Sequence, residues 1–452
     1  MSDAAARASA AAMVSDGDLG CVVIRGRRRM VAVHRSTEAA ARIRRIADDA
    51  EQTTAAFALG PGASAYAAVA GAGTEAVQHA ARLVAERRGG RWRGDTGVAT
   101  PDSLVESTPP DLDPAQIVAD FLAMWPHTGE LEICAEAHTS SEHRLFVPAR
   151  GEPVREVVQT GAAVVDILRA GVPIADSDIA WTGTAVPDIA ALAERIDRAV
   201  HRGHAPHRHP VPARVQLLLL DGSAGPFLHE VCGHLVESTR QRPSLLAGHE
   251  ARAVAAEILT VADDPGIPGG FGAHRYTMLG SPARRRALLD EGRLVGLLAD
   301  TPDGPWRAED ARHHPRPRMS HLTVEPARTA EQLDEAIGAA TVPVIEVHRL
   351  GFGSLDHRDG TVVLEVKDAT LCDGSRTHRL EPFLVTAEAR HILREVRAVG
   401  CAAGVRTWSA YCLATSGRLP VGATVPSLLT GPLTTLPHRS LGALHAAASS
   451  DR

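Results

Sequence analysis

The segment that most constrains the fold of this 452-residue chain is RVQLLLLDGSAGPFLHEVCGH, residues 214–234. Its continuous apolar run predicts a strand that is covered on both faces. A glycine-containing turn at residues 221–225 follows, and Pro226 then favours the first turn of a helix. We therefore expect a buried strand that presents a helix, beginning near residue 226, at the edge of a sheet.

That helix carries His229, Glu230 and His234 in a His-Glu-x3-His pattern. Residues five apart lie about 140° apart around an ideal α-helix, so the two imidazoles would not meet on one ion. A single π-turn absorbs the extra residue, and Gly233 is the expected place for it because glycine has no side chain to clash. Catalytic zinc needs a third protein ligand. From the residues alone this ligand is open among Cys232, Glu237, Cys372, Cys401, Cys412 and several acids.

Histidine is abundant here, with 22 residues, so chance pairs are common. The four histidines of HRGHAPHRHPVPAR, residues 201–214, also suggest a metal. Three prolines in the same stretch favour an extended linker instead, and we place the domain boundary there.

Periodicity predicts an α+β fold with two domains. Residues 1–18 are expected to be a flexible lead, residues 19–205 an N-terminal mixed α/β domain, and residues 206–452 a β-rich C-terminal domain that carries the HExxxH helix. In the first domain we expect helices from Glu38 (with Ile43 and Ile46 on one face), at residues 74–88, from Asp113, and at 188–200. Strands are expected at residues 21–24, 30–34, 131–137, 154–159 and 163–168. In the second, hairpins are expected at residues 290–293 and 373–374.

Composition excludes several classes. A net charge of −6, from 48 basic and 54 acidic residues, argues against a nucleic-acid binder. The six cysteines are scattered and form no CxxC pair, so we expect no disulfide framework in this chain. We expect no signal peptide and no membrane span, and therefore a cytoplasmic protein.

Several ordered motifs of the second half resemble the TldD/PmbA metallopeptidase family, once described as modulators of DNA gyrase. GPFLHEVCGHLVEST, residues 225–239, resembles the family's His-Glu-x-x-Gly-His helix. An Asp-Asp, a glycine-rich segment and a hairpin follow in residues 261–300, and then Pro317-Arg318-Met319. CLATSGRLPVGATVPSLL, residues 412–429, resembles the C-terminal signature, a cysteine followed by Pro-Val-Gly and Pro-x-Leu.

The resemblance implies a zinc site with His229, His234 and Cys412 as ligands and Glu230 as general base. It implies a TldD-type peptidase that cleaves unfolded or short peptides, with precursor trimming in a biosynthetic pathway as one role. The partner would be a PmbA/TldE-type subunit, or a second copy in a homodimer. Arg318 is a candidate for substrate contact, with a structural salt bridge as its alternative. Two further readings stay open: a zinc amidohydrolase acting on a non-peptide intermediate, and a non-catalytic partner or regulator.

Overall fold

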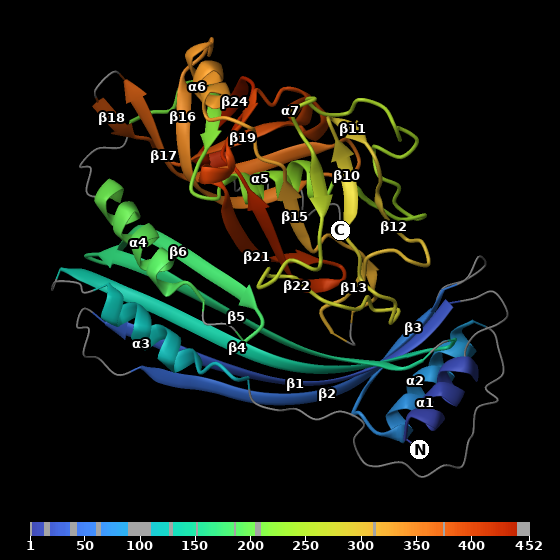
Figure 1. Ribbon diagram of the computed structural model, residues 1–452. Helices are drawn as coiled ribbons and strands as arrows, with labels where there is room; N and C mark the ends of the chain where they lie inside the picture. Colours follow the sequence, from blue (N-terminus) through green and yellow to red (C-terminus); the bar gives the residue numbers. More distant parts are fainter. Residues whose placement is uncertain are drawn as a thin grey trace.

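The computed structural model describes residues 2–12, 19–36, 43–59, 65–88, 110–125, 130–150, 152–184, 187–203, 209–310, 313–373 and 376–440. The chain is arranged in two parts, an N-terminal sheet with helices and a β-rich part stacked on it (Figure 1). This agrees with the α+β class expected from the sequence.

The N-terminal part is a six-stranded antiparallel sheet in the order β3-β2-β1-β4-β5-β6. Its strands are β1 Leu19–Ser36, β2 Arg44–Leu59, β3 Ala65–Ala70, β4 Leu131–Pro148, β5 Val154–Arg169 and β6 Val172–Thr182. Because side chains alternate along a strand, each strand serves two cores. Val22 and Ile24 of β1 pack towards helices, whereas Cys21 and Val23 pack against Met278 and other residues of the second part.

Four helices cover one face of this sheet. They are α1 Ser2–Ala12, α2 Thr74–Arg87, α3 Pro114–Met124 and α4 Ile189–Gly203. The first two share a core with one end of the sheet and the last two with the other end. The Asp113 carboxylate accepts a hydrogen bond from the Ala115 amide at 3.0 Å, the expected N-cap of α3. The opposite face is left for the β-rich part.

The β-rich part contains two main sheets. One has the order β11-β10-β9-β15-β22-β21 and the other the order β16-β17-β19-β24-β7-β23-β20. Since β16 also pairs with β7, the strands β7, β16, β17, β19 and β24 form a closed ring. All of β7 except its first residue is buried, which confirms the strand predicted from the apolar run.

The elements of this part have the following bounds: β7 Arg214–Leu219, α5 Ala224–Leu228, η1 His229–Gly233, β8 Glu237–Ser238, β9 Val261–Asp263, β10 Arg286–Asp290, β11 Arg293–Leu294, β12 Leu298–Ala299, β13 Trp306–Arg307, β14 Arg316–Pro317, β15 His321–Val324, α6 Glu331–Gly338, β16 Val344–Leu355, β17 Thr361–Asp373, β18 Arg376–Arg379, β19 Phe383–Glu388, α7 Ala389–Arg394, β20 Ala398–Val399, η2 Ala402–Gly404, β21 Arg406–Ala414, β22 Gly417–Val425, β23 Leu428–Leu429, β24 Leu433–Pro437 and η3 His438–Ser440. Both predicted hairpins are present, β10–β11 and β17–β18.

Several local expectations were wrong. The strands expected separately at residues 21–24 and 30–34 are one strand, β1, and those expected at residues 154–159 and 163–168 are one strand, β5. The helix predicted from Glu38 is replaced, in its described part, by β2, which pairs with β1 over almost its whole length. The spacing of Ile43 and Ile46 fits a helix, but long-range pairing overrides local propensity. The expected flexible lead contains α1, whose alanines favour a helix and whose Ala6 and Ala10 are buried against the sheet. Residues 13–18 and 204–208 lie outside the described residues, so the proposed domain boundaries stay predictions.

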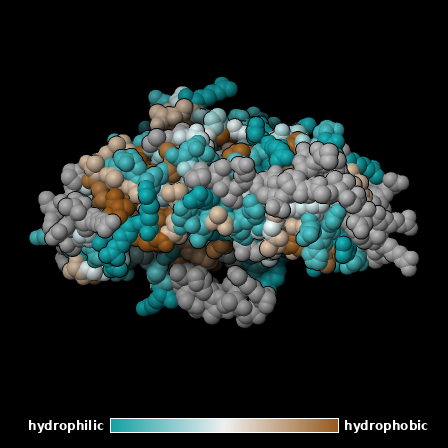
Figure 2. Space-filling view, turned by 90° about the horizontal axis from the view of Figure 1, so that it is seen from below, coloured by the Kyte–Doolittle hydropathy of each residue, from teal (hydrophilic) through white to brown (hydrophobic). Residues whose placement is uncertain are grey.

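The surface seen from the side of the N-terminal sheet is mostly hydrophilic, and its hydrophobic residues show as separate patches (Figure 2). Exposed apolar side chains include Val157 and Val164 of β5.

Candidate metal centre and active site

The helix after β7 changes its winding at the motif. The short helix α5 runs directly into η1, a single π-helical turn. The His234 amide donates to the His229 carbonyl at 3.0 Å, which is a hydrogen bond across five residues. The two imidazole rings consequently lie 4.7 Å apart between centroids. The π-turn predicted from the His-x4-His spacing is confirmed.

Gly233 is needed at this turn for a packing reason. A Cβ built on it would overlap the sulfur of Met319 and would lie 3.3 Å from a methyl group of Leu322. Because glycine has no side chain, the turn can approach Met319 and Leu322 closely, whereas a larger residue would require Met319 to move.

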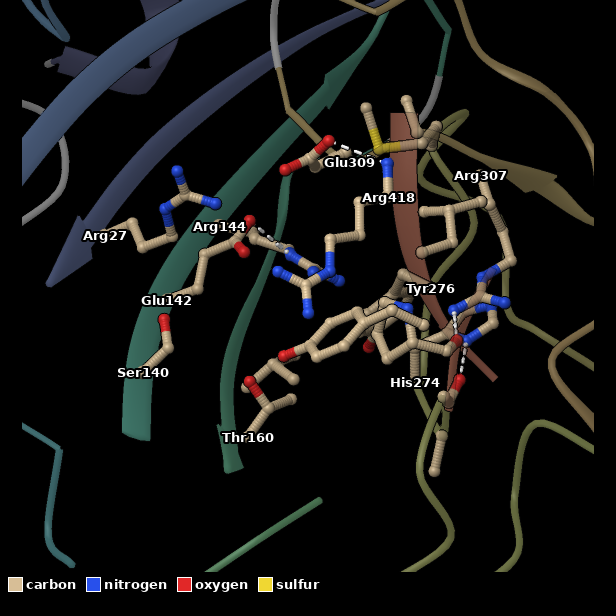
Figure 3. Close-up of a pocket in the computed structure, with 18 of the residues that line it drawn as sticks. Arg27, Ser140, Glu142, Arg144, Thr160, His274, Tyr276, Arg307, Glu309 and Arg418 are labelled. Carbon is tan, nitrogen blue, oxygen red and sulfur yellow. Dashed lines mark hydrogen bonds and ion pairs between the residues drawn. The ribbon is translucent and has the colours of Figure 1, made fainter. Parts of the chain in front are cut away.

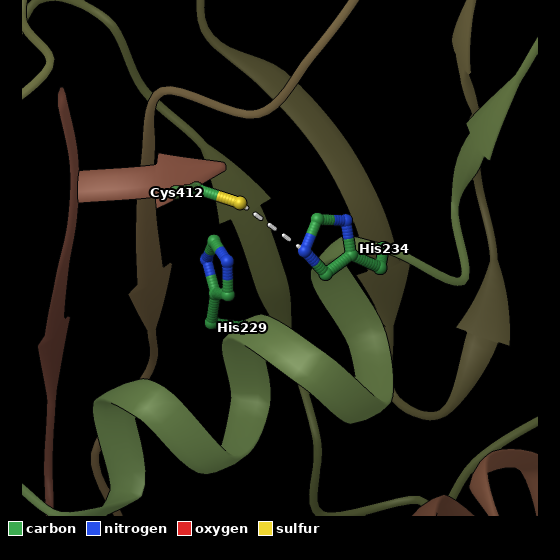
Figure 4. Close-up of side chains that lie close together, drawn as sticks. All are labelled: His229, His234 and Cys412. Atoms are coloured by element: carbon green, nitrogen blue, oxygen red, sulfur yellow. Dashed lines mark hydrogen bonds between the residues drawn. The ribbon is translucent and has the colours of Figure 1, made fainter. Parts of the chain in front are cut away.

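A third donor comes from a distant strand. Cys412 of β21 points its thiol at the two histidines, and its Sγ lies 3.4 Å from Nε2 of His234 (Figure 4). One donor atom from each of His229, His234 and Cys412 lies within 4.8 Å of the others. In the part of the chain that the structure describes, this is the only group of three metal-ligating side chains of this kind.

The other candidate ligands lie elsewhere or act differently. Cys232 is fully buried in the hydrophobic core, and burial raises the pKa of its thiol to about 12. Cys372 is exposed on β17 and Cys401 is partly buried before η2. Neither belongs to the group of three.

Glu237 and Arg318 support two of the three donors, His234 and Cys412. The Glu237 carboxylate lies 3.1 Å from Nδ1 of His234, so Nε2 is the nitrogen turned towards Cys412. Arg318 donates from Nε to Glu237 at 2.8 Å and from Nη2 to the Cys412 sulfur at 2.9 Å. Carboxylate partners of this kind orient metal-ligating histidines. The arginine thus places a positive charge beside the Cys412 sulfur.

Burial and these charges shift the pKa values of the two histidines in opposite directions. Burial, followed by the charge of His234, lowers the pKa of His229 well below its usual value. Burial also lowers the pKa of His234, but Glu237, Glu230 and the hydrogen bond to Cys412 together raise it well above the usual value. His229 is thus a neutral imidazole, ready to act as a ligand, and the second histidine sits in a site that favours positive charge.

Glu230 lies beside the cluster, and its Oε1 is 4.0 Å from Nε2 of His229. It is 9% exposed, and its Oε2 has no hydrogen-bond partner among the described residues. Burial raises the pKa of this carboxyl group. Strand β16 passes close by, and a Cβ at Gly353 would approach the Glu230 side chain to 2.6 Å. A glycine on the neighbouring strand therefore makes the room that the carboxylate occupies.

The donor set fits a zinc ion. Two imidazoles and one thiolate are ligands that zinc prefers, and they leave one position of a tetrahedron open. Ligand atoms of such an ion are about 3.6 Å apart, given bonds of about 2.1 and 2.3 Å. The separation between the His234 nitrogen and Cys412 sulfur already matches this value. His229 Nδ1 is buried without a hydrogen-bond partner among the described residues.

Arg318, the candidate for substrate contact, is 3% exposed and uses its donors on Glu237, Ser416 and Cys412. These contacts favour the alternative of a structural salt bridge. Sequence reasoning missed two neighbours of the cluster: the Trp408 ring, 5.4 Å from that of His229, and the His357 ring, 6.1 Å from that of His234. A lone tryptophan or histidine far along the chain gives no local signal of such a position.

Comparison with known proteins places the site in a family. The family model described as the PmbA/TldA metallopeptidase C-terminal domain matches residues 212–435, which include all three donors. A metalloprotease TldD homologue of Buchnera aphidicola is 24% identical over 230 residues, covering 48% of this chain and 47% of that protein. A metalloprotease of Methanothermobacter thermautotrophicus is 34% identical over 91 residues, covering 20% of each chain.

Solved structures show the same fold over nearly the whole length. TldE from Thermococcus kodakarensis has a TM-score of 0.69 at 15% identity, with 93% of this chain and 96% of that chain covered. A protein of Thermotoga maritima titled a modulator of a DNA gyrase gives the same score and coverage at 11% identity.

The family model and the named relatives are those of metallopeptidases. The chain belongs to the TldD/PmbA family. The matched region spans less than half of the curated relatives named above, so the activity, substrate and partners of this chain are proposals.

None of the described helices is both long enough and apolar enough to cross a bilayer.

Proposed function

We propose that this protein is a zinc-dependent peptidase of the TldD type. The observation that carries the proposal is the convergence of His229, His234 and Cys412, because the cysteine lies 178 residues beyond its neighbour His234 yet its sulfur is 3.4 Å from that ring. A protein that served only as a binding partner would not require this donor set. The buried carboxylate of Glu230 beside it favours catalysis over a purely structural metal.

His229, His234 and Cys412 would hold the ion. Bound zinc supplies a water of lowered pKa and polarises the carbonyl group of the substrate. Glu237 and Arg318 keep the His234 ring and the Cys412 sulfur in place, as their hydrogen bonds show. The site therefore rests on a preformed support rather than on movement of the ligands.

Glu230 would act as the general base. Its Oε2 has no other hydrogen bond among the described residues, and its raised pKa makes it a better proton acceptor than an exposed carboxylate. It would take a proton from the attacking water and pass it to the leaving amine. Gly353 leaves the space in which the side chain can turn between the two.

The substrate proposed is an extended peptide, either short or unfolded. Two edge strands, β6 and β21, line a groove of about 960 Å³ that begins beside Trp408. Cys412 lies on β21 itself, so a peptide added to that edge would pass the metal ligands. Strand addition reads the peptide backbone more than its side chains, which suits a trimming enzyme that acts on precursor peptides.

A PmbA/TldE-type subunit is the proposed partner, with a homodimer as the alternative. The likeness to TldE supports a shared fold, on which such a pair would assemble. Light scattering of the chain alone, and after co-expression with a TldE-type subunit, separates the two.

The function is tested by zinc content and peptide cleavage in matched variants. Cys412→Ala should lose both the zinc and the activity. Glu230→Gln should keep one zinc per chain and lose at least a hundredfold in kcat, because the base is gone but the ligands are intact. Cys372→Ala, at an exposed cysteine outside the cluster, is the control and should change neither. Full zinc content in Cys412→Ala would refute the ligand set.

Zinc in the wild type without cleavage of any peptide in a library of unfolded sequences would refute the peptidase. An amidohydrolase acting on a non-peptide intermediate would then use the same donor set.

A further inference from the structure

A second candidate site lies on the side of the β21–β22 hairpin that faces away from the metal cluster. A partly open cavity of about 110 Å³ lies where the N-terminal sheet meets this hairpin (Figure 3). Its walls come from β1, β4 and β5 on one side, and from residues 272–278, β13 and the hairpin on the other. Tyr411 lines the cavity, whereas the next residue, Cys412, points to the opposite side, as alternation along a strand requires. The hairpin thus separates this cavity from the metal cluster.

The cavity wall carries a surplus of positive charge. Five arginines line it against two glutamates: Arg27, Arg29, Arg144, Arg307 and Arg418 against Glu142 and Glu309. Two of the arginines are neutralised, since Arg144 pairs with Glu142 at 2.8 Å and Arg27 pairs with Glu51 at 3.0 Å.

The other three arginines have no carboxylate within ion-pair distance among the described residues. Arg307 donates to the backbone carbonyls of Met319 and Pro420. The guanidinium of Arg418 stacks over the Tyr411 ring, 3.9 Å from its centroid. Nε of Arg29 is buried without a hydrogen-bond partner among the described residues. Arg29 is half-buried and Arg418 is exposed. An anion in the cavity would offset the positive charge of these arginines.

The positive charge of the arginines affects the pKa of the neighbouring His138. Burial, and then the charges of Arg29 and Arg418, lower the pKa of His138 to about 4, so this ring is neutral. Its Nε2 lies 2.8 Å from the Tyr411 hydroxyl. Ser140 and Thr160, which face each other across β4 and β5, add two hydroxyl groups to the same wall (Figure 3). The cavity is lined by hydrogen-bond donors in excess of acceptors.

We propose that this cavity binds a small oxyanion, a carboxylate or a phosphate group, held by Arg29 and Arg418. The volume equals that of roughly three or four water molecules, which suits such a group. Guanidinium groups recognise both anions through paired N–H donors. Since Arg29 belongs to the N-terminal sheet and Arg418 to the hairpin, the anion would tie the two parts of the chain together. The proposal does not depend on the peptidase function.

The test uses the full-length protein and measures binding by calorimetry together with thermal unfolding. The probes are inorganic phosphate, N-acetyl-Ala-Ala with its free carboxylate, and the amide of that dipeptide, each compared with chloride at equal ionic strength. We expect saturable heat and a rise in Tm with phosphate or the acid. Arg418→Gln and Arg29→Gln should each weaken binding at least tenfold.

Arg28→Gln is the matched control. Arg28 is the neighbour of Arg29 on β1, but it pairs with Asp48 on the exposed side of the strand, so the variant should bind like the wild type. Circular dichroism checks that each variant is folded, and if Arg418→Gln is not, Arg29→Gln decides alone.

Each outcome is decisive. Binding of phosphate alone supports a phosphate-bearing ligand, and binding of the acid but not the amide supports a carboxylate. No saturable binding of phosphate or of the acid, effects that chloride reproduces, an amide that binds as tightly as the acid, or unchanged affinity in Arg29→Gln would overturn the proposal. None of these readings requires cleavage, so a failure here is separate from a failure of the proposed peptidase.

Discussion

Replacement of Arg318 by methionine separates a structural role of this residue from a role in substrate contact. The arginine is 3% exposed and donates to Glu237, Ser416 and Cys412. In Arg318→Met the buried Glu237 carboxylate keeps only His234 and the Met319 amide as partners. Breaking a buried ion pair from one side costs about 3–5 kcal/mol. We expect about 3 kcal/mol, because those two partners remain.

The assay is urea unfolding, with zinc content measured on the same samples. The free energy of unfolding should fall by about this amount, and zinc should be bound more weakly because the Cys412 thiolate loses its cationic partner. In the double variant Arg318→Met/Glu237→Gln the loss should be smaller than the sum of the two single losses, since no unpaired carboxylate is left. Arg285→Met, at an exposed arginine 4.0 Å from Asp264, is the control and should lie within about 0.5 kcal/mol of the wild type. Unchanged stability and zinc content with a raised KM would refute this reasoning and restore the substrate-contact role.

Three further predictions follow from the packing and charges. Gly233→Ala should destabilise the protein by about 1–3 kcal/mol in urea unfolding and reduce its zinc affinity, because the new methyl group overlaps Met319 at the π-turn; unchanged zinc affinity would contradict it. Burial lowers the pKa of His321 from its usual value of about 6.5 to about 4. The native state therefore binds fewer protons than the unfolded state in this window, so stability should decrease by up to about 3 kcal/mol as pH falls from 6.5 to about 4. His321→Gln should lose that part of the pH slope, and an identical slope would refute it. Chelator treatment should abolish cleavage and lower Tm, and zinc should restore both, whereas recovery with magnesium alone would argue against the thiolate site.

Local features of the site could be predicted from the sequence because they depend on residues that are close together along the chain. The apolar run of β7, Pro226 and the five-residue spacing of His229 and His234 predict a strand, a helix start and a π-turn, and all three are present. The third donor was different. Spacing alone could not choose Cys412 among the cysteines, because it meets His234 only through the pairing of distant strands; the family resemblance supplied it.

Long-range pairing also explains what was missed. The Arg318–Glu237 contact joins residues 81 positions apart, and the helix expected after Glu38 gave way to β2 because β1 lies beside it. In the sequence, the arginines of β1 form only a short, isolated cluster. Only the sheet shows that alternation sends Arg27 and Arg29 into one cavity and Arg28 to the surface.

X-ray absorption spectroscopy of the protein as purified tests the central claim most directly. We predict one zinc per chain with a single sulfur neighbour at about 2.3 Å and nitrogen or oxygen neighbours at about 2.0–2.1 Å. The zinc signal should be lost in Cys412→Ala, and the sulfur shell should persist in Cys232→Ala. A zinc spectrum without sulfur in the wild type, or a sulfur shell that survives in Cys412→Ala, would contradict the account.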